Sequence, residues 1–109
     1  MLGDARKSKV ILAVDDAPEN LALLRAMIED DGYSFVGAPT GKKCLALLGR
    51  LIPSFILMDV QMPELDGFET CRRLRRMPSM AAVPVGFVTT RKTEGDVRTA
   101  YNSAETTSS

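Results

Sequence analysis

The chain has 109 residues, of which 45% are hydrophobic and 26% charged, a composition typical of one small globular domain. Its 14 basic and 14 acidic residues cancel, so no overall positive field predicts binding to nucleic acid or to a membrane surface. The absence of histidine removes the commonest general base and metal ligand, which excludes histidine-dependent hydrolases and structural zinc sites.

A strand and an amphipathic helix are predicted at the start of the chain. Residues 9–14 contain a short continuous apolar run, which is typical of a strand buried on both faces. Pro18 suits the first turn of a helix, and residues 30–32 (DDG) end it. The apolar stripe of this helix consists of Leu21, Leu23, Leu24, Met27 and Ile28.

The next segment repeats the pattern of a strand followed by a helix. Residues 33–38 are a strand candidate, and residues 39–41 (PTG) form a turn. A second apolar stripe then predicts a helix that Pro53 stops. The members of this stripe are Cys44, Leu45, Leu47, Leu48 and Leu51.

A third strand candidate, residues 55–58, runs directly into a carboxylate, Asp59. Residues 60–67 (VQMPELDG) are predicted to form a loop, because proline and the Asp66-Gly67 pair favour turns. A third helix follows this loop. Its inward-facing side chains are expected to be Phe68, Cys71 and Leu74.

The last predicted strand, residues 83–88, ends on Thr89-Thr90. Residues 91–102 are predicted to form a final helix with a narrow apolar face, and residues 103–109 (SAETTSS) a frayed polar tail. Continuous apolar strands that alternate with amphipathic helices predict an α/β fold, a doubly wound parallel sheet of the flavodoxin type. We expect a single domain over residues 1–109, with its core at about residues 9–102.

The location of the protein is predicted from what its sequence lacks. The N-terminal residues MLGDARKSK contain no apolar core of a signal peptide, and no apolar run approaches the roughly 20 residues of a membrane span. We therefore expect a soluble cytoplasmic protein. Its two cysteines, Cys44 and Cys71, are expected to be buried reduced thiols rather than a disulfide or a redox site.

Polar side chains follow three of the predicted strands. Asp15 and Asp16 follow the first, Asp59 the third, and Thr89 the last. Ligands bind beyond the carboxyl ends of the strands in open parallel sheets, and Mg²⁺ would relieve the repulsion among three carboxylates there. Each residue alone also has an ordinary explanation, with Asp16 as a helix N-cap, Asp59 as a turn cap and Thr89 as a strand end. Their coincidence at successive strand ends favours a functional site.

Three stretches carry a family resemblance: ILAVDDAPENLALL, ILMDVQMPELDGFETCRRLR and VPVGFVTT. In these stretches the chain resembles the receiver domain of two-component response regulators. The middle stretch is the most specific, because it joins an apolar strand and Asp59 to the motif M-P-x-x-D-G-F-E. The resemblance covers about residues 9–102.

The resemblance implies a role for each matching residue. Asp59 would be the phosphoacceptor, taking a phosphoryl group from the phosphohistidine of a sensor histidine kinase or a histidine phosphotransfer protein. Asp15 and Asp16 would hold Mg²⁺ together with Asp59, and the backbone carbonyl of Gln61 would be a further ligand. Thr89 would hydrogen-bond the phosphoryl group and act as the switch. These roles fit the chemistry of phosphoryl transfer, which requires that the reacting groups be positioned and that the negative charge of the phosphoryl oxygens be neutralised.

The resemblance fails at the C-terminus, where the usual fifth strand, its lysine and the last helix have no counterpart. Lys92 follows Thr89 too closely to take the role of that lysine. The chain is then a natural degenerate receiver, a truncated or frameshifted product, or a chain whose C-terminal part is missing. In each case an exposed edge of the strand at residues 83–88 would favour self-association or domain swapping.

Three functions are compared on these residues. The first is a phosphoacceptor signalling module, which is not an enzyme with a separate substrate. The alternative is a degenerate or truncated pseudo-receiver, a binding module without phosphorylation switching, which the missing C-terminal elements favour and the intact acidic set opposes. A phosphatase or dehalogenase with an aspartate nucleophile would need an acid where Gln61 stands.

Four arginines near the end of the third predicted helix are ordinary there, so no nucleic-acid partner is expected: Arg72, Arg73, Arg75 and Arg76.

Overall fold

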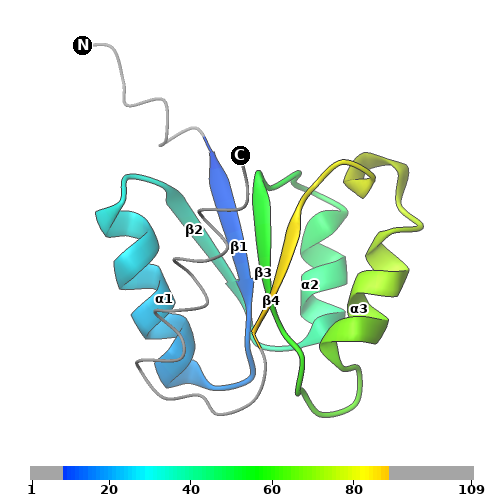
Figure 1. Ribbon diagram of the computed structural model, residues 1–109, viewed down its shortest axis with the longest axis horizontal. Helices are drawn as coiled ribbons and strands as arrows, with labels where there is room; N and C mark the ends of the chain where they lie inside the picture. Colours follow the sequence, from blue (N-terminus) through cyan, green and yellow to red (C-terminus); the bar gives the residue numbers. More distant parts are fainter. Residues whose placement is uncertain (1–8, 89–109) are drawn as a thin grey trace.

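The computed structural model describes residues 9–88, which form a parallel sheet with helices on both faces (Figure 1). Thr89 and the helix predicted at residues 91–102 lie outside these described residues. A 3₁₀ turn at Pro78–Met80 precedes the last strand. The elements in chain order are β1 (Val10–Val14), α1 (Pro18–Asp30), β2 (Ser34–Ala38), α2 (Gly41–Leu48), β3 (Phe55–Asp59), α3 (Gly67–Leu74) and β4 (Val85–Val88).

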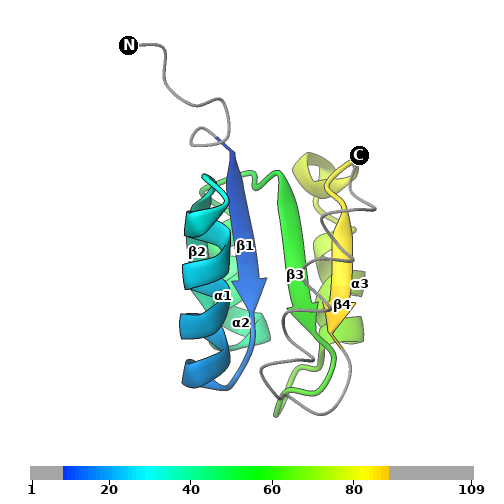
Figure 2. The same ribbon diagram turned by 60° about the vertical axis from the view of Figure 1, so that its left-hand side comes forward.

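The described sheet has the strand order β2-β1-β3-β4, and every pairing is parallel. Figure 2 shows the arrowheads of β1, β3 and β4 at the same end of the sheet. Val14 pairs with Met58 in the register of β1 and β3, so the residues that follow both strands emerge side by side. The predicted doubly wound parallel sheet is confirmed. β4 is an edge strand of the described sheet, and its pairing with another chain stays a prediction.

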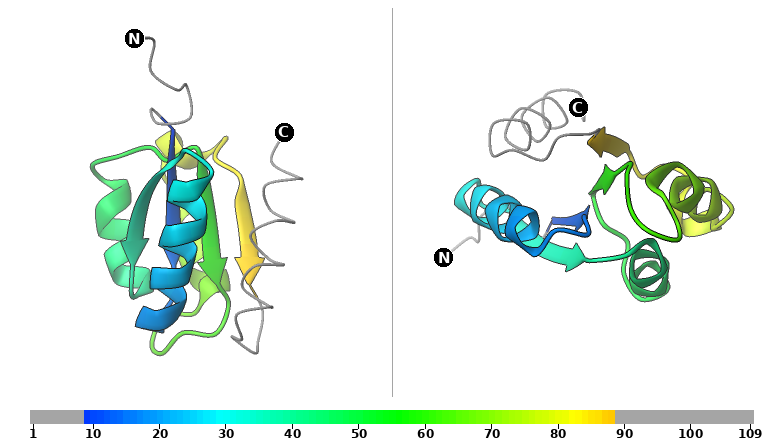
Figure 3. Two further views of the ribbon diagram at one scale, coloured as in Figure 1. Left: turned by 90° about the vertical axis from the view of Figure 1, so that its left-hand side faces the viewer. Right: turned by 90° about the horizontal axis from the view of Figure 1, so that it is seen from below.

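The core is divided into two clusters because successive side chains of a strand point to opposite faces. Leu12, Ile56 and Met58 pack on one face beneath α2 and α3, whereas Ile11 and Leu57 pack on the other beneath α1. Figure 3 shows this division, with α1 on one side of the sheet and α2 and α3 on the other. The inner strands β1 and β3 are therefore covered on both faces, as their continuous apolar sequences predict, whereas β2 and β4 are more exposed.

Local sequence explains where the helices begin. Pro18 occupies the first turn of α1, where its missing N–H costs nothing. Ala17 precedes it as the N-cap without a side-chain hydrogen bond, so Asp16 is not the cap of this helix. The hydroxyl of Thr40 caps α2 by accepting from the N–H of Lys43 at 3.0 Å. Because α1 follows β1 and α2 follows β2 in the chain, both helices begin near the carboxyl ends of the strands.

Two expected helix features are wrong in detail. α2 ends at Leu48 because Gly49 follows it, so Leu51 lies beyond the helix rather than on its apolar stripe. On α3, Phe68 is 54% exposed and Cys71 only half-buried. The residues of α3 that are buried are Gly67, Thr70 and Leu74.

The exposed ring of Phe68 has a partner on the neighbouring strand. Its centroid lies 5.0 Å from that of Phe87 on β4, with the two rings tilted by 45°.

The predicted start of β4 is also corrected, because the strand begins at Val85, after Pro84, which has no N–H to donate to a sheet. Among the residues described, both cysteines are free thiols, as expected, and Cys44 alone is fully buried.

Candidate metal centre at the carboxyl ends of β1 and β3

Three carboxylates meet beyond the carboxyl ends of two neighbouring strands. Asp15 follows β1 directly and Asp59 ends β3, while Asp16 is the next residue along the chain from Asp15. One oxygen from each of the three side chains lies within 4.8 Å of the others. Asp15 and Asp59 are 1% and 0% exposed, whereas Asp16 is exposed. The cluster therefore has a buried floor and one ligand that faces solvent.

The Asp15 side chain is held by hydrogen bonds from the N-cap and the first turn of α1. The N–H of Ala17 donates to Oδ1 of Asp15 at 2.9 Å, and Nδ2 of Asn20 donates to Oδ2 at 3.4 Å. The Asp15 main chain is fixed as well, because its N–H donates to the carbonyl of Ala38 at 3.1 Å. Both oxygens of this carboxylate are thus directed by named donors before any ligand arrives.

Asn20 is a site residue that the sequence analysis missed. It is 4% exposed and lies on the same helical stripe as Leu24 and Ile28, four and eight positions further on. A short amide on an otherwise apolar stripe is a signal that the sequence contains, because buried polar groups need hydrogen-bond partners. The partner, Asp15, becomes apparent only when α1 is placed against β1.

Asp59 is held by the turn that follows it. The N–H of Gln61 donates to Oδ1 of Asp59 at 3.1 Å, while the Gln61 side chain is exposed. The main chain of Gln61 thus lies against the phosphoacceptor candidate, and the role of its carbonyl as a metal ligand stays a prediction. Thr89 lies outside the described residues, although Val88 before it pairs in register with Asp59.

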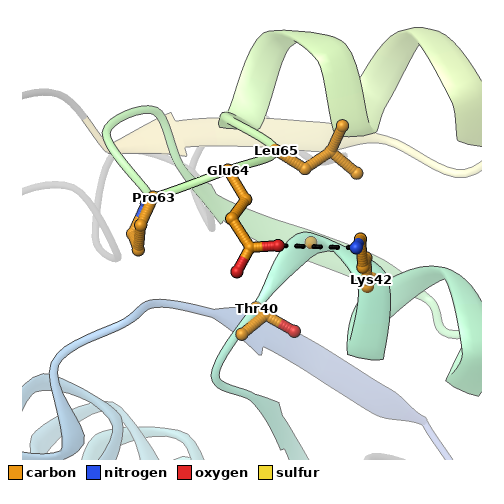
Figure 4. A pocket seen from close by; sticks show the side chains of 6 residues that line it. Thr40, Lys42, Pro63, Glu64 and Leu65 are labelled. Atoms are coloured by element: carbon orange, nitrogen blue, oxygen red, sulfur yellow. Dashed lines mark ion pairs between the residues drawn. The ribbon is translucent and has the colours of Figure 1, made fainter.

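The loop between β3 and α3 is tied to the start of α2. Lys42 forms an exposed ion pair with Glu64 at 3.4 Å, and the two residues face each other across a small hollow (Figure 4). Thr40 and Pro63 line the same hollow. Glu64 has a φ of 66°, in the left-handed region that disfavours side chains. Within residues 9–88 it is the one non-glycine with a positive φ.

The chemistry of the cluster fits a hard divalent cation. Three like charges within this distance repel each other, and two of them have lost most of their contact with water. Carboxylate and carbonyl oxygens are the ligands that Mg²⁺ prefers, with waters completing its coordination. The exposed Asp16 leaves room for such waters on the solvent side.

A parallel α/β sheet with three carboxylates at the carboxyl ends of β1 and β3 is the arrangement of receiver-like signalling domains. The family model for the response regulator receiver domain matches residues 11–106. The chain therefore belongs to the response regulator receiver domain family.

Known relatives agree with this assignment. An uncharacterised 14.6 kDa protein of Leptolyngbya boryana is 42% identical over 93 residues, which cover 85% of this chain and 71% of that protein. Protein PilH of Pseudomonas aeruginosa is 40% identical, over 79% of this chain and 71% of PilH. The response regulator PleD of Caulobacter vibrioides is also 40% identical, but the chain spans only 19% of its length.

Solved structures show the same fold. The N-terminal domain of a response regulator receiver protein from Methanoculleus marisnigri superposes with a TM-score of 0.72 at 32% identity, covering 87% of this chain and 77% of that one. The Mn²⁺-bound form of response regulator Rcp1 has a TM-score of 0.68 at 26% identity, covering 86% and 74% of the two chains. Among the helices of residues 9–88, none is long and apolar enough to span a membrane.

Proposed function

We propose that this receiver domain accepts a phosphoryl group on Asp59 in a Mg²⁺-dependent reaction and signals through protein–protein contacts. The donor is the phosphohistidine of a sensor histidine kinase or of a histidine phosphotransfer protein in the cytoplasm. The observation that carries this proposal is the convergence of Asp15, Asp16 and Asp59 within 4.8 Å at the strand ends. Membership of the receiver family and the Mn²⁺-bound relative support it.

Asp59 is suited to act as the nucleophile because its carboxylate is held in place. A carboxylate oxygen forms the bond to phosphorus while the phosphorus–nitrogen bond of the phosphohistidine breaks, and the histidine nitrogen keeps the electron pair. The N–H of Gln61 on Oδ1 and the full burial of Asp59 fix the orientation of this carboxylate. Such positioning removes much of the entropic cost of bringing the reacting atoms together. The chain is thus an acceptor of the group and not a catalyst with a separate substrate.

The remaining site residues are proposed to bind the metal ion and the phosphoryl group. Asp15 and Asp16, with Asp59 and the Gln61 carbonyl, would hold Mg²⁺, which when bound neutralises negative charge on the carboxylates and the incoming phosphoryl oxygens. Ala17 and Asn20 keep the Asp15 carboxylate directed into the cluster. The hydroxyl of Thr89 is proposed to hydrogen-bond the phosphoryl group once it is attached, and so to report its arrival.

The proposal is tested by intact mass after the purified chain is incubated with acetyl phosphate, with and without Mg²⁺. We expect one phosphoryl adduct on the wild-type chain, dependent on Mg²⁺ and absent from Asp59→Asn. Asp66→Asn is the matched control, because Asp66 is a carboxylate on the same loop that caps α3 and does not belong to the cluster. An adduct on Asp59→Asn, or no adduct on a folded wild-type chain that binds Mg²⁺, would contradict the proposal.

A further inference from the structure

The start of α3 packs directly against the backbone of Asp59. A Cβ at Gly67 would lie 2.2 Å from the Asp59 carbonyl oxygen and 2.9 Å from both its carbonyl carbon and the Cα of Val60. Real Cβ atoms essentially never come closer than 3.0 Å to such atoms. All three atoms belong to the main chain, so no side-chain rotation can make room. Only glycine allows α3 to approach β3 this closely.

This contact falls on the turn that organises the site. The N–H of Gly67 donates to the carbonyl of Val60 at 2.9 Å, and the N–H of Val60 donates to the carbonyl of Val88 at 2.9 Å. Val60 is therefore held from α3 on one side and from β4 on the other. It lies between Asp59 and Gln61, the two residues joined by the hydrogen bond on the Asp59 carboxylate. A shift at position 67 reaches this carboxylate through main-chain contacts alone.

We propose that Gly67 is a positioning residue for the phosphoacceptor site, one that sets the Asp59–Gln61 turn through its lack of a side chain. This inference rests on the proposed function, in which Asp59 and Gln61 hold the metal and Asp59 takes the phosphoryl group. A methyl group at position 67 must displace either α3 or the turn. Moving the turn changes the direction of the Asp59 carboxylate and of the Gln61 carbonyl relative to Asp15 and Asp16.

Gly41 offers a matched control for crowding without contact to the site. A Cβ there would meet Oγ1 of Thr70 at 2.3 Å and the carbonyl oxygen of Leu65 at 3.1 Å, where α2 packs on α3. The shortest distance is similar to that at Gly67, but here it is to a side-chain hydroxyl, and neither Asp59 nor Val60 is among the three nearest neighbours. Gly49 is the baseline control, because its nearest neighbour would be the Ala46 carbonyl at 3.3 Å.

The experiment compares Gly67→Ala, Gly41→Ala and Gly49→Ala with the wild-type chain. The free energy of unfolding is measured without Mg²⁺, Mg²⁺ affinity by calorimetry, and phosphoryl uptake from acetyl phosphate by intact mass. We expect Gly67→Ala and Gly41→Ala both to lose stability. Only Gly67→Ala should bind Mg²⁺ about tenfold more weakly, because its Cβ displaces residues that orient the metal ligands. Its phosphoryl uptake should fall with its Mg²⁺ affinity.

The outcomes separate the inference from the proposed function. If Gly67→Ala binds Mg²⁺ as the wild-type chain does, or loses no more affinity than Gly41→Ala, the positioning role is overturned. If the wild-type chain binds Mg²⁺ without taking up phosphoryl, the proposed function fails, and Mg²⁺ affinity alone still decides the role of Gly67. A wild-type chain that binds no Mg²⁺ overturns both.

A second measurement uses the wild-type chain alone, in case Gly67→Ala does not fold. Mg²⁺ is titrated while backbone amide resonances are followed by NMR. We expect the amide of Gly67 to shift with the same midpoint as that of Gln61, because the two are joined through Val60, while the amide of Gly49 stays in place. A Gly67 amide that does not respond while Gln61 does would overturn the inference.

Discussion

The side-chain amide of Asn20 donates to Oδ2 of Asp15 at 3.4 Å, and both residues are buried. This contact joins the first turn of α1 to the residue after β1. Together with the Ala17 N–H on Oδ1, it leaves the carboxylate little freedom to turn away from Asp16 and Asp59. Within the cluster, Asp15 is thus directed by neutral donors at the start of α1, and the carboxylates themselves repel each other.

Replacing Asn20 by alanine is expected to weaken both the fold and the site. The change leaves a buried carboxylate oxygen without this donor, which costs about 1–3 kcal/mol in the free energy of unfolding. Mg²⁺ affinity should fall as well, because Asp15 is no longer directed. Denaturant unfolding and calorimetry check the two effects, and Glu19→Ala on the exposed side of the same helical turn is the control. Unchanged Mg²⁺ affinity in Asn20→Ala would show that Asn20 is not needed to direct the Asp15 carboxylate.

Replacing Asp59 by asparagine is expected to stabilise the chain in Mg²⁺-free buffer. The substitution removes one of three mutually repelling charges from a fully buried position, and the asparagine oxygen can still accept from the N–H of Gln61. Mg²⁺ should then stabilise the wild-type chain by about 2.7 kcal/mol at 100 times its dissociation constant, and the variant by much less. Thermal unfolding with and without Mg²⁺ checks this, and an equal Mg²⁺-dependent gain in both would remove Asp59 from the metal site.

Strand positions and the acidic cluster were predictable because both follow from short-range patterns. Continuous apolar runs identify buried parallel strands, and the carboxyl ends of such strands meet by topology. The inward face of α3 was not predictable in this way. Leu74 is buried as its helical spacing predicts, but Phe68 and Cys71 are not. Thr70 is buried in their place, with its hydroxyl satisfied by the Asp66 carbonyl at 2.7 Å.

The close approach of Gly67 to Asp59 illustrates the same limit. A glycine after aspartate indicates a turn, but the sequence does not say what lies opposite its Cα. That depends on how α3 docks on β3, a tertiary arrangement that no local pattern encodes. Asn20 differs from Gly67 in this respect, because its place on an apolar helical stripe is visible in the sequence even though its partner is not.

Replacing Glu64 by glycine is expected to stabilise the fold. A residue with a side chain at a φ of 66° is strained by about 1 kcal/mol or more, and glycine relieves this strain. The ion pair that Glu64 loses with Lys42 is exposed at both ends and contributes little. Glu64→Ala is the control, since it removes the ion pair and keeps the strain. Chemical denaturation should show a gain for Glu64→Gly alone, and a loss in both variants would mean that the ion pair outweighs the strain.

Burial of Cys44 makes stability depend on pH in the alkaline range. Desolvation, with a smaller effect from the nearby Cys71, raises the pKa of the Cys44 thiol from 9.0 to about 12. The folded chain therefore favours the neutral thiol more than the unfolded chain does. The contribution of this preference to the free energy of unfolding is fully present below pH 9. It is lost as the pH rises toward 12.

The comparison of the wild-type chain with Cys44→Ala isolates this effect from other alkaline titrations. We expect the free energy of unfolding of the wild-type chain to fall more steeply above pH 9 than that of the variant. At pH 8 iodoacetamide should modify the half-buried Cys71 before Cys44. The prediction is contradicted if the free energy of unfolding falls equally with pH in the wild-type chain and in Cys44→Ala. Alkylation of Cys44 before Cys71 would contradict it as well.

The place of β1 in the strand order has a consequence for synthesis on the ribosome. β1 pairs with β2 on one side and with β3 on the other, and both pairings are parallel. Its nearly fully buried side chains therefore remain without their second neighbour until residue 59 has left the exit tunnel. Asp59 is the last residue of that second neighbour, so a nascent chain completes its central strand and its acidic cluster in the same step.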